Sequence, residues 1–484
     1  MHNPTEEQQA IIDFARTHTE NLCVNALAGA AKTTTLEMIC HAVTNIPILA
    51  LAFNKRIADE MTKRLPSHVE CRTMNALGHR VWAQACGRKL VVDTAKMGDI
   101  VRRLIDELPR ARQGEAWEDF ADTLRWLRYA KRDGWVPDKW IKAGTPIVFA
   151  RDWLESFDEE PTALQYILID GAMTESIRQA YEGNIDYDDQ IYMPVIFGAP
   201  WPKYPLVVCD EVQDLSPINH VMLERLIYKR VIVVGDPYQS IYGFRGAVSN
   251  GMCQLVKRYS MYELPLSMTF RVPKKGVERA KSRVPQFRAP EWQIEGDINH
   301  LEPWGPEHIP DGAAIICRNN APLFTCALRL LKAGRSIKLV GMDIGPGLVR
   351  IMRKLGPASM SRRDIGFALD NWLKRELAKA KAEHVVFEKY ECLSVLCERG
   401  DNLGQAIAFA EDLFKRNGAI QLLSYHKVKG LEYQHVFVLD SWRCPSKWAR
   451  PDTEEWEQEL NCIYVAETRF KETMTFINLE DFDA

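Results

Sequence analysis

Long apolar runs, closely paired cysteines and an excess of positive charge are all missing from this chain of 484 residues. No apolar run approaches the roughly 18 residues of a membrane-spanning helix, and the first residues lack the charged and apolar segments of a signal peptide. We therefore expect a cytoplasmic protein that does not contact a membrane. The formal net charge of −3 excludes a uniformly basic protein that holds nucleic acid by counterion release alone, so any nucleic acid would bind in a locally basic groove.

The twelve cysteines contain no CxxC pair, and the closest spacing is that of Cys392 and Cys397. Zinc knuckles and iron–sulfur clusters need closely spaced thiolates, so we expect neither. Cys23, Cys209 and Cys317 lie inside apolar runs and are expected to be reduced, buried thiols. With 46% hydrophobic residues, the chain is long enough for two to four domains with substantial cores.

Short apolar runs rich in β-branched residues recur along the chain. They cover residues 22–25, 48–51, 206–209, 231–234, 313–317, 420–423, 436–439 and 474–477. Continuous apolar runs of this length are typical of strands buried on both faces of a parallel sheet. The pattern therefore predicts an α/β protein with two parallel sheets.

The first run leads into a segment with one glycine, followed by a helical pattern. The segment reads Ala26-Leu27-Ala28-Gly29-Ala30-Ala31-Lys32-Thr33-Thr34. A phosphate loop of the form GxxxxGK[ST] wraps phosphates with backbone N–H groups at a helix N-terminus, and here Ala26 and Ala31 replace both outer glycines. Lys32 and Thr33 keep the ammonium for the phosphates and the hydroxyl for Mg²⁺. We predict an ATP site despite the methyl group of Ala31, which narrows the permitted backbone angles. The alternative is a plain alanine-rich helix start.

Two acids, Asp210 and Glu211, directly follow the run 206–209. In a nucleotide-hydrolysing enzyme the first carboxylate of such a pair can hold Mg²⁺ while the second polarises the attacking water. An isolated acidic pair is as often a solvated turn or helix cap. The nucleotide interpretation is favoured by a second apolar run, 231–234, which leads into Gly235-Asp236-Pro237-Tyr238-Gln239-Ser240-Ile241-Tyr242-Gly243-Phe244-Arg245-Gly246-Ala247.

These segments resemble the superfamily 1A helicases, the family of UvrD, Rep and PcrA, whose motif II is DExxQD and whose motif III is GDxxQSIYxxRGA. Within that family, residues 52–55, 243–245, 459–461 and 464–469 favour the F-box DNA helicase branch, without an F-box segment ahead of the motor. The resemblance covers nearly the whole chain. It implies an α/β fold of two RecA-like, parallel-sheet P-loop NTPase domains with helical insertions.

The resemblance also implies domain boundaries. The expected parts are motor domain 1A (residues 1–78 and 201–265), helical insertion 1B (79–200), motor domain 2A (266–356 and 419–484) and a short helical insertion 2B (357–418). In 1B, Arg125, Arg128, Tyr129 and Arg132 fall at helical spacing. They could line a DNA track, but a solvated basic face over an apolar stripe is the favoured interpretation.

Four catalytic roles are implied by the resemblance. Glu211 would be the general base, and Gln239 would link the γ-phosphate to DNA. Arg271 in motif IV and Arg469 in motif VI would be arginine fingers, a task that suits a planar, permanently charged fork.

Contacts to the bound nucleotide are implied as well. Gln8, in a segment that resembles the Q motif, would bind the edge of adenine. Phe270 would stack on the adenine ring in place of a tyrosine, and Glu432 in motif V would accept a hydrogen bond from the ribose. Thr33 and Asp210 would hold Mg²⁺.

Contacts to single-stranded DNA are expected from several motifs. The candidate residues are Asn54, Thr73, Asn75, Tyr242, Phe244, Arg245 and His426. The rings of Tyr242 and Phe244 could stack on bases without sequence preference. Core packing is the alternative, although the neighbouring Gly243 and Gly246 are more typical of an exposed loop.

The resemblance thus implies a monomeric, ATP- and Mg²⁺-dependent motor that moves 3′ to 5′ on single-stranded DNA or a 3′-tailed duplex by closure of its two lobes, with recombinase or replication proteins as candidate partners. The loop 442–456 is a candidate wedge for strand separation. Two alternatives stay open. One is a translocase that strips bound proteins with little unwinding. The other is a nucleotide-gated DNA-binding subunit of a larger complex, whose hydrolysis is impaired by Ala31.

Overall fold

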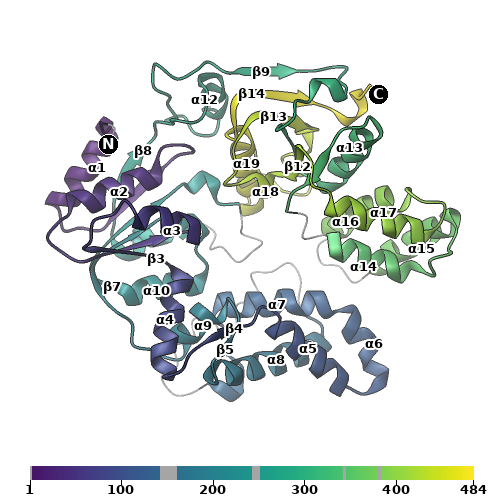
Figure 1. The fold of residues 1–484 in the computed structure, drawn as a ribbon, viewed down its shortest axis with the longest axis horizontal. Helices are drawn as coiled ribbons and strands as arrows, with labels where there is room; N and C mark the ends of the chain where they lie inside the picture. The colour runs from purple at the N-terminus through teal and green to yellow at the C-terminus, as the bar shows by residue number, and fades with distance from the viewer. Residues whose placement is uncertain (1–2, 142–160, 242–250, 342–344, 379–382, 484) are drawn as a thin grey trace. The chain divides into compact units, whose positions relative to one another are not determined.

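The computed structural model describes residues 3–141, 161–241, 251–341, 345–378 and 383–483 (Figure 1). The chain divides into two compact units. The first contains Met1–Leu27 and Ala31–Ser267, and the second contains Ala28–Ala30 and Met268–Ala484. Over the described ranges, no helix is long and apolar enough to cross a membrane.

The first unit is built on a sheet whose described strands are all parallel, in the order β3-β2-β6-β7-β1-β8. Its strands are β1 (Leu22–Ala26), β2 (Ile48–Ala52), β3 (Val69–Thr73), β6 (Tyr204–Cys209), β7 (Ile227–Gly235) and β8 (Tyr262–Leu266). The four inner strands contain the predicted apolar runs. The edge strands β3 and β8 were not predicted, because their half-exposed positions carry polar residues such as Glu70 and Glu263.

Helices connect these strands and cover the sheet. They are α1 (Glu6–Thr17), α2 (Lys32–Ala42), α3 (Lys55–Thr62), α4 (Met74–Cys86), α10 (Pro217–Leu226) and α11 (Gly251–Tyr259). Several helices begin at a side chain that caps their first turn. Thr5 and Gln8 form a reciprocal capping box on α1, for example, in which each side chain accepts from the other's backbone N–H.

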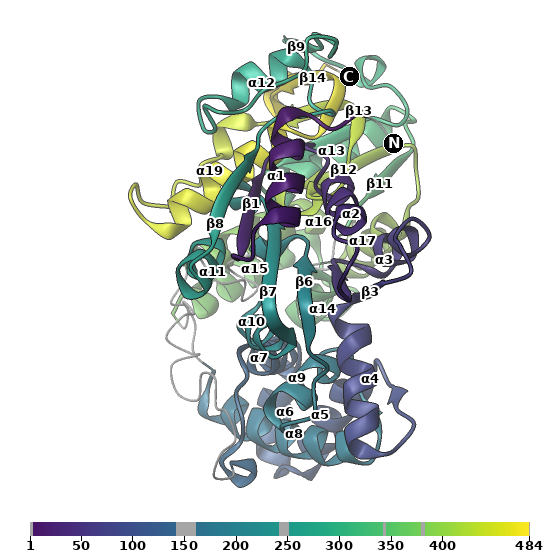
Figure 2. The ribbon, with the colours of Figure 1, turned by 90° about the vertical axis from the view of Figure 1, so that its left-hand side faces the viewer.

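A helical insertion lies between β3 and β6 in the chain. Its elements are β4 (Val91–Val92), α5 (Lys96–Glu107), α6 (Arg110–Glu118), α7 (Phe120–Asp133), α8 (Ala163–Tyr181), β5 (Asn184–Ile185) and α9 (Asp189–Ile196). Helix α4 runs from the sheet into this insertion (Figure 2). On α7, the side chains of Trp126, Leu127 and Ala130 form the buried apolar stripe. Of the four residues predicted for the solvated face, Arg128 is exposed, whereas Arg125, Tyr129 and Arg132 are half-buried.

The second unit contains another sheet of parallel strands, in the order β11-β12-β10-β13-β14-β9. Its strands are β9 (Asp297–His300), β10 (Ala314–Cys317), β11 (Ile337–Leu339), β12 (Ile420–Ser424), β13 (Tyr433–Leu439) and β14 (Phe470–Ile477). Its helices are α12 (Lys274–Ala280), α13 (Asn320–Lys332), α14 (Gly345–Leu355), α15 (Arg362–Leu377), α16 (Glu383–Cys397), α17 (Leu403–Lys415), α18 (Tyr425–Val428) and α19 (Glu454–Glu467).

The predicted α/β class with two RecA-like parallel sheets is therefore confirmed. The finer boundaries between motor domains and insertions remain predictions. Helix α4 crosses the proposed boundary at residue 78 without a break. The thiols of Cys23, Cys209 and Cys317 are free and buried as expected, and burial raises the pKa of Cys23 to about 12.

Helices α4 and α9 approach each other closely at Gly78. A Cβ atom at this position would lie 2.1 Å from the backbone oxygen of Gln190. The glycine at residue 78 is thus required by a backbone-to-backbone contact that holds α9 against α4.

We expect Gly78→Ala to lower the free energy of unfolding by about 2 kcal/mol or more, because the added methyl group must displace backbone rather than a flexible side chain. Urea or thermal unfolding measures the change. Gly114→Ala is the matched control, since nothing lies within 4 Å of a Cβ at that position in α6 and alanine favours a helix by about 0.5–1 kcal/mol. Equal tolerance of both substitutions would contradict the close contact.

Candidate functional site

The predicted phosphate loop follows β1 and ends where α2 begins. Ala31 takes a left-handed conformation, with φ 56° and ψ 43°, which L residues other than glycine adopt at a cost of about 1–2 kcal/mol. Gly29 is also left-handed, with φ 71°. A Cβ on Gly29 would lie 2.5 Å from the hydroxyl oxygen of Thr269. The loop therefore keeps a strained backbone at Ala31 even though the expected glycine is absent.

Lys32 and Thr33 each meet one of the two acids that follow β6. Lys32 Nζ lies 3.1 Å from Glu211 Oε2, and Thr33 Oγ1 donates to Asp210 Oδ2 at 3.3 Å. The contacts form because the carboxyl ends of parallel strands face the same edge of a sheet. The structure thus brings together the four first-unit residues that the sequence predicts for phosphate, metal and water.

The predicted metal ligands fit a magnesium ion by their chemistry. Asp210 and Thr33 supply oxygen atoms only, the donors that Mg²⁺ prefers. Burial, reinforced by the charge of Glu211, raises the pKa of Asp210 to about 7 although Lys32 opposes the shift. A cation beside Asp210 would supply the positive charge that this buried carboxylate needs to stay ionised.

Glu211 also takes a left-handed backbone conformation, with φ 52°. Backbone strain of this kind is typical of functional sites where surrounding contacts fix the residue. Its backbone N–H donates to Asp210 Oδ1 at 2.9 Å, and its Oε2 accepts from the amide of Gln213. Lys32 and Gln213 thus both donate to the same carboxylate oxygen of Glu211, Oε2.

Gln213 and Asp236, for which the sequence predicted no role, extend this arrangement toward Gln239 in motif III. Gln213 Oε1 accepts from the backbone N–H of Asp236 at 3.1 Å. Asp236 is fully buried and accepts from Gln239 Nε2 at 2.7 Å. A chain of hydrogen bonds thus connects Glu211 to Gln239. The sequence did indicate that both residues could matter, because Gln213 lies in the motif DEVQD and Asp236 lies in the motif GDPYQ.

Gln8 lies buried beside the start of α2. Its Oε1 accepts from Thr5 N at 3.0 Å, and its Nε2 donates to Thr35 Oγ1 at 3.0 Å. A carboxamide has two donor hydrogens and two acceptor positions. A second donor and a second acceptor remain on Gln8 for the edge of a base.

In the second unit, Arg271 and Glu432 form an ion pair. Arg271 Nη1 lies 2.8 Å from Glu432 Oε1, and Lys471 Nζ lies 3.0 Å from Glu432 Oε2. Burial alone would raise the pKa of Glu432, but Arg271 and Lys471 hold it below its ordinary value. Lys471 was not predicted, because it begins the polar run Lys471-Glu472-Thr473 directly after motif VI, which does not indicate a partner for any one of these side chains.

Two donor atoms of Arg271, Nε and Nη2, are buried and have no hydrogen-bond partner among the described residues. A buried guanidinium N–H without an acceptor is costly. The unused donors fit an anionic group such as a phosphate, which accepts from two guanidinium nitrogens at once.

Arg469, the other predicted finger, is only 1% exposed. Its Nε donates to Val465 O at 2.7 Å and its Nη2 to Thr468 Oγ1 at 3.0 Å. The side chain thus folds back on the end of α19 in this structure.

Phe270 and the loop segment Ala28–Ala30 belong to the same unit. Phe270 N donates to Gly29 O at 2.9 Å, and the Ala28 N–H donates to Tyr464 Oη at 2.9 Å. The ring of Phe270 stacks on that of Trp292, with centroids 6.2 Å apart. Phe270 is therefore a half-buried aromatic residue attached to the segment Ala28–Ala30. Stacking of its ring on adenine stays a prediction.

Three predicted DNA contacts lie near the carboxyl ends of β2 and β3. Asn54 and Thr73 cap α3 and α4 through their side-chain oxygens. Asn75 Nδ2 donates to Tyr187 O at 2.9 Å. A cavity of about 310 Å³ lies beside these residues, lined by Phe53, Asn75, Arg132, Asp188, Asp210 and Ile218 among others.

Four further residues were predicted to contact DNA. Tyr242, Phe244 and Arg245 lie outside the described residues. In the second unit, His426 is the second residue of α18 (Tyr425–Val428), and its Nε2 lies 3.5 Å from Cys462 Sγ.

The chain is similar to domains and to full-length proteins that are already known. An AAA domain matches residues 8–245, and a UvrD-like helicase C-terminal domain matches residues 402–481. F-box DNA helicase protein 1 of Schizosaccharomyces pombe is 23% identical over 524 residues, 97% of this chain and 57% of that protein. F-box DNA helicase 1 of Gallus gallus is 23% identical over 97% of this chain and 48% of its own length. ATP-dependent DNA helicase UvrD2 of Mycobacterium tuberculosis is 24% identical over 93% of this chain and 75% of its length. The chain thus spans about half the length of the two F-box relatives.

We expect Ala31→Gly to raise the free energy of unfolding by roughly 0.5–1 kcal/mol, because relief of the left-handed strain exceeds the added entropy of the unfolded chain. ATP hydrolysis should change less than about twofold, since Ala31 already adopts the backbone conformation that the loop requires. Ser260→Gly is the matched control, because Ser260 is also left-handed, with φ 46°. A large gain of DNA-stimulated hydrolysis in Ala31→Gly alone would instead indicate that the alanine impairs the loop.

Proposed function

We propose that this chain, which belongs to the UvrD-like superfamily 1A helicases, is an ATP-dependent motor on single-stranded DNA. The observation that carries the proposal is the meeting of Lys32 with Glu211 and of Thr33 with Asp210 at one edge of the first sheet. A lysine, a hydroxyl and two carboxylates in this arrangement suit phosphoryl transfer to water. The proposal includes ATP as the fuel, Mg²⁺ as its metal and 3′ to 5′ movement.

Each nucleotide-site residue has a proposed task. Lys32 binds the phosphates, while Thr33 and Asp210 hold Mg²⁺, which when bound neutralises charge on the phosphate oxygens. Glu211 orients the attacking water and accepts its proton. Its hydrogen bond from Gln213 fixes the carboxylate, and the continuation through Asp236 to Gln239 offers a path from the nucleotide to motif III.

The second unit would contribute Arg271, whose buried donors lack an acceptor among the described residues. Binding of the γ-phosphate by Arg271 would satisfy them. Arg469 would need to leave its contacts with Val465 and Thr468 to act as a second finger. The proposed role of Arg271 rests on its unused donors. The proposed role of Arg469 rests on motif VI alone.

Strand separation is proposed for the loop that follows β13. Trp442 is 67% exposed, and the guanidinium of Arg443 lies 4.5 Å from its ring centroid. Glu459 fixes the loop, because its carboxylate accepts from Ser446 N at 2.9 Å and also pairs with Arg318. An exposed ring with an adjacent cation on a fixed loop suits stacking on a base beside a phosphate.

The proposed activity is tested by ATP hydrolysis with and without single-stranded DNA. We expect stimulation by DNA, and we expect Glu211→Gln to lower turnover by about 10²- to 10⁴-fold while ATP and DNA still bind, because it removes the general base but not the phosphate contacts. Glu60→Gln, on the exposed face of α3, is the matched control. Hydrolysis near the unmodified rate in Glu211→Gln would disprove the base assignment. A lack of stimulation in the unmodified protein would favour the nucleotide-gated subunit.

The wedge is tested by release of a strand from a 3′-tailed duplex. We expect Trp442→Ala to lower strand release by about fivefold or more, the loss of one stacked base, while DNA-stimulated hydrolysis stays within about twofold. Trp117→Ala removes another exposed tryptophan, from α6, and should change neither rate. Stimulated hydrolysis without any strand release by the unmodified protein would support the protein-stripping translocase.

A further inference from the structure

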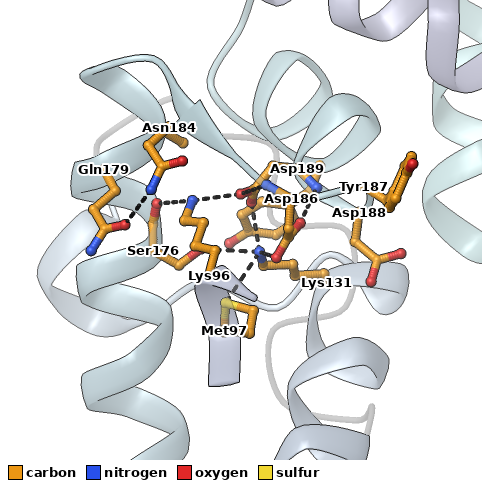
Figure 3. A network of polar contacts seen from close by, with 12 residues as sticks. Lys96, Met97, Lys131, Ser176, Gln179, Asn184, Asp186, Tyr187, Asp188 and Asp189 are labelled. Carbon is orange, nitrogen blue, oxygen red and sulfur yellow. Dashed lines mark hydrogen bonds and ion pairs between the residues drawn. The ribbon is translucent and has the colours of Figure 1, made fainter. Parts of the chain in front are cut away.

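Four charged side chains are buried together in the helical insertion of the first unit (Figure 3). Lys96 from α5 and Lys131 from α7 meet Asp186 and Asp189, which flank the start of α9. Lys96 Nζ lies 2.6 Å from Asp189 Oδ2. Lys131 Nζ lies 2.6 Å from Asp186 Oδ2 and 2.7 Å from Asp189 Oδ1. We call these four residues the buried charge cluster.

The charges are balanced and their hydrogen bonds are extensively satisfied. The main chain and side chain of Ser176 in α8 also accept, from Lys96 and Lys131 respectively. The side chains of Lys96 and Asp189 are 0% exposed. Burial of single charges costs several kcal/mol each, and a paired cluster stabilises a fold little more than apolar residues would. Its benefit is a defined geometry, because one arrangement satisfies all four groups.

The geometry that the cluster defines is that of the turn between Asp186 and Asp189. Asp186 N donates to Asp189 Oδ2 at 3.0 Å, and Asp189 N donates to Asp186 Oδ1 at 2.8 Å. The same two carboxylates therefore bind the lysines and close the turn on itself. Tyr187 and Asp188, at the tip of the turn, lie on the side away from Lys96 (Figure 3).

The tip of the turn carries the contact to Asn75. The backbone oxygen of Tyr187 accepts from Asn75 Nδ2 at 2.9 Å, and this is the asparagine expected to contact DNA. Helix α4, which contains Asn75, is further fixed to α9 by the close approach at Gly78. Asn75 is therefore joined to three helices of the insertion through one turn.

We propose that the buried charge cluster is a positioning device for DNA binding, in which Lys131 and Asp186 orient the amide of Asn75 through the backbone oxygen of Tyr187. This inference rests on the proposed function, because it assumes that Asn75 contacts the single strand. The cluster touches no DNA itself. Through the turn at Tyr187, the cluster couples the position of Asn75 to the helices of the insertion.

The test is a double variant, Lys131→Met with Asp186→Asn. It removes one positive and one negative charge, and it leaves the pair of Lys96 and Asp189 intact. An asparagine at residue 186 can still accept from Asp189 N. We expect the dissociation constant for a fluorescein-labelled oligothymidylate, measured by anisotropy, to rise about fivefold to tenfold, the loss of about one well-placed hydrogen bond. The control is Arg103→Met with Glu175→Gln, which removes the ion pairs of Glu175 with Arg103 and Arg178 in the same insertion and should leave the dissociation constant unchanged.

A double-mutant cycle with Asn75→Ala separates positioning from general destabilisation. If the cluster acts through Asn75, the double variant should weaken binding no further once Asn75 is alanine. Additive losses, or an unchanged dissociation constant in the double variant, would overturn the inference. If Asn75→Ala binds normally, the inference fails even though DNA-stimulated hydrolysis by the unmodified protein would still support the proposed function.

The unmodified protein offers a second test should the double variant fail to fold. We expect oligothymidylate to slow amide hydrogen exchange at residues 186–189 and around Lys96 and Lys131, because binding at Asn75 would stabilise the turn and the helices attached to it. Slower exchange confined to the segment of Asn75 would overturn the inference.

Discussion

The cost of removing a charge from water dictates where the functional side chains of both units lie. Lys32 and Glu211 are paired at the edge of the first sheet. In the insertion, two lysines and two aspartates balance one another. In the second unit, Arg318 and Glu459 form a buried pair at 2.6 Å that also holds the loop of Trp442. Arg271 departs from this pattern, since two of its buried donors have no acceptor among the described residues, and that departure points to a ligand.

Backbone strain marks the same place as the paired charges. Ala31 and Glu211 both have left-handed conformations, and both flank the proposed phosphate and metal position. Neighbouring hydrogen bonds keep them there. Ala31 O accepts from the backbone and the hydroxyl of Thr35, and Glu211 N donates to Asp210. Strain that is maintained by surrounding contacts keeps a site organised before a ligand binds.

The proposed nucleotide and DNA regions of the first unit are linked through short polar connections. Asp210 and Asn75 line the same cavity, and Gln213 connects Glu211 to Asp236. The hydrogen bonds from Glu211 through Gln213 to the backbone N–H of Asp236 join the segments that follow the adjacent strands β6 and β7. The helical insertion is connected to Asn75 through the backbone oxygen of Tyr187.

The sequence by itself determined the two parallel sheets, because completely buried strands must be continuously apolar. It also predicted that Lys32, Thr33, Asp210 and Glu211 belong to one site, and the structure brings these side chains together. Their roles remain predictions. It did not reveal the edge strands β3 and β8, whose polar residues face solvent. Only the tertiary structure decided that Lys96 and Lys131 meet Asp186 and Asp189, or that Lys471 joins Glu432. These partners lie on different helices and strands, and the sequence does not distinguish a buried lysine from an exposed one. Packing decides which partner a buried lysine has, because the lysine is removed from water only when the chain folds.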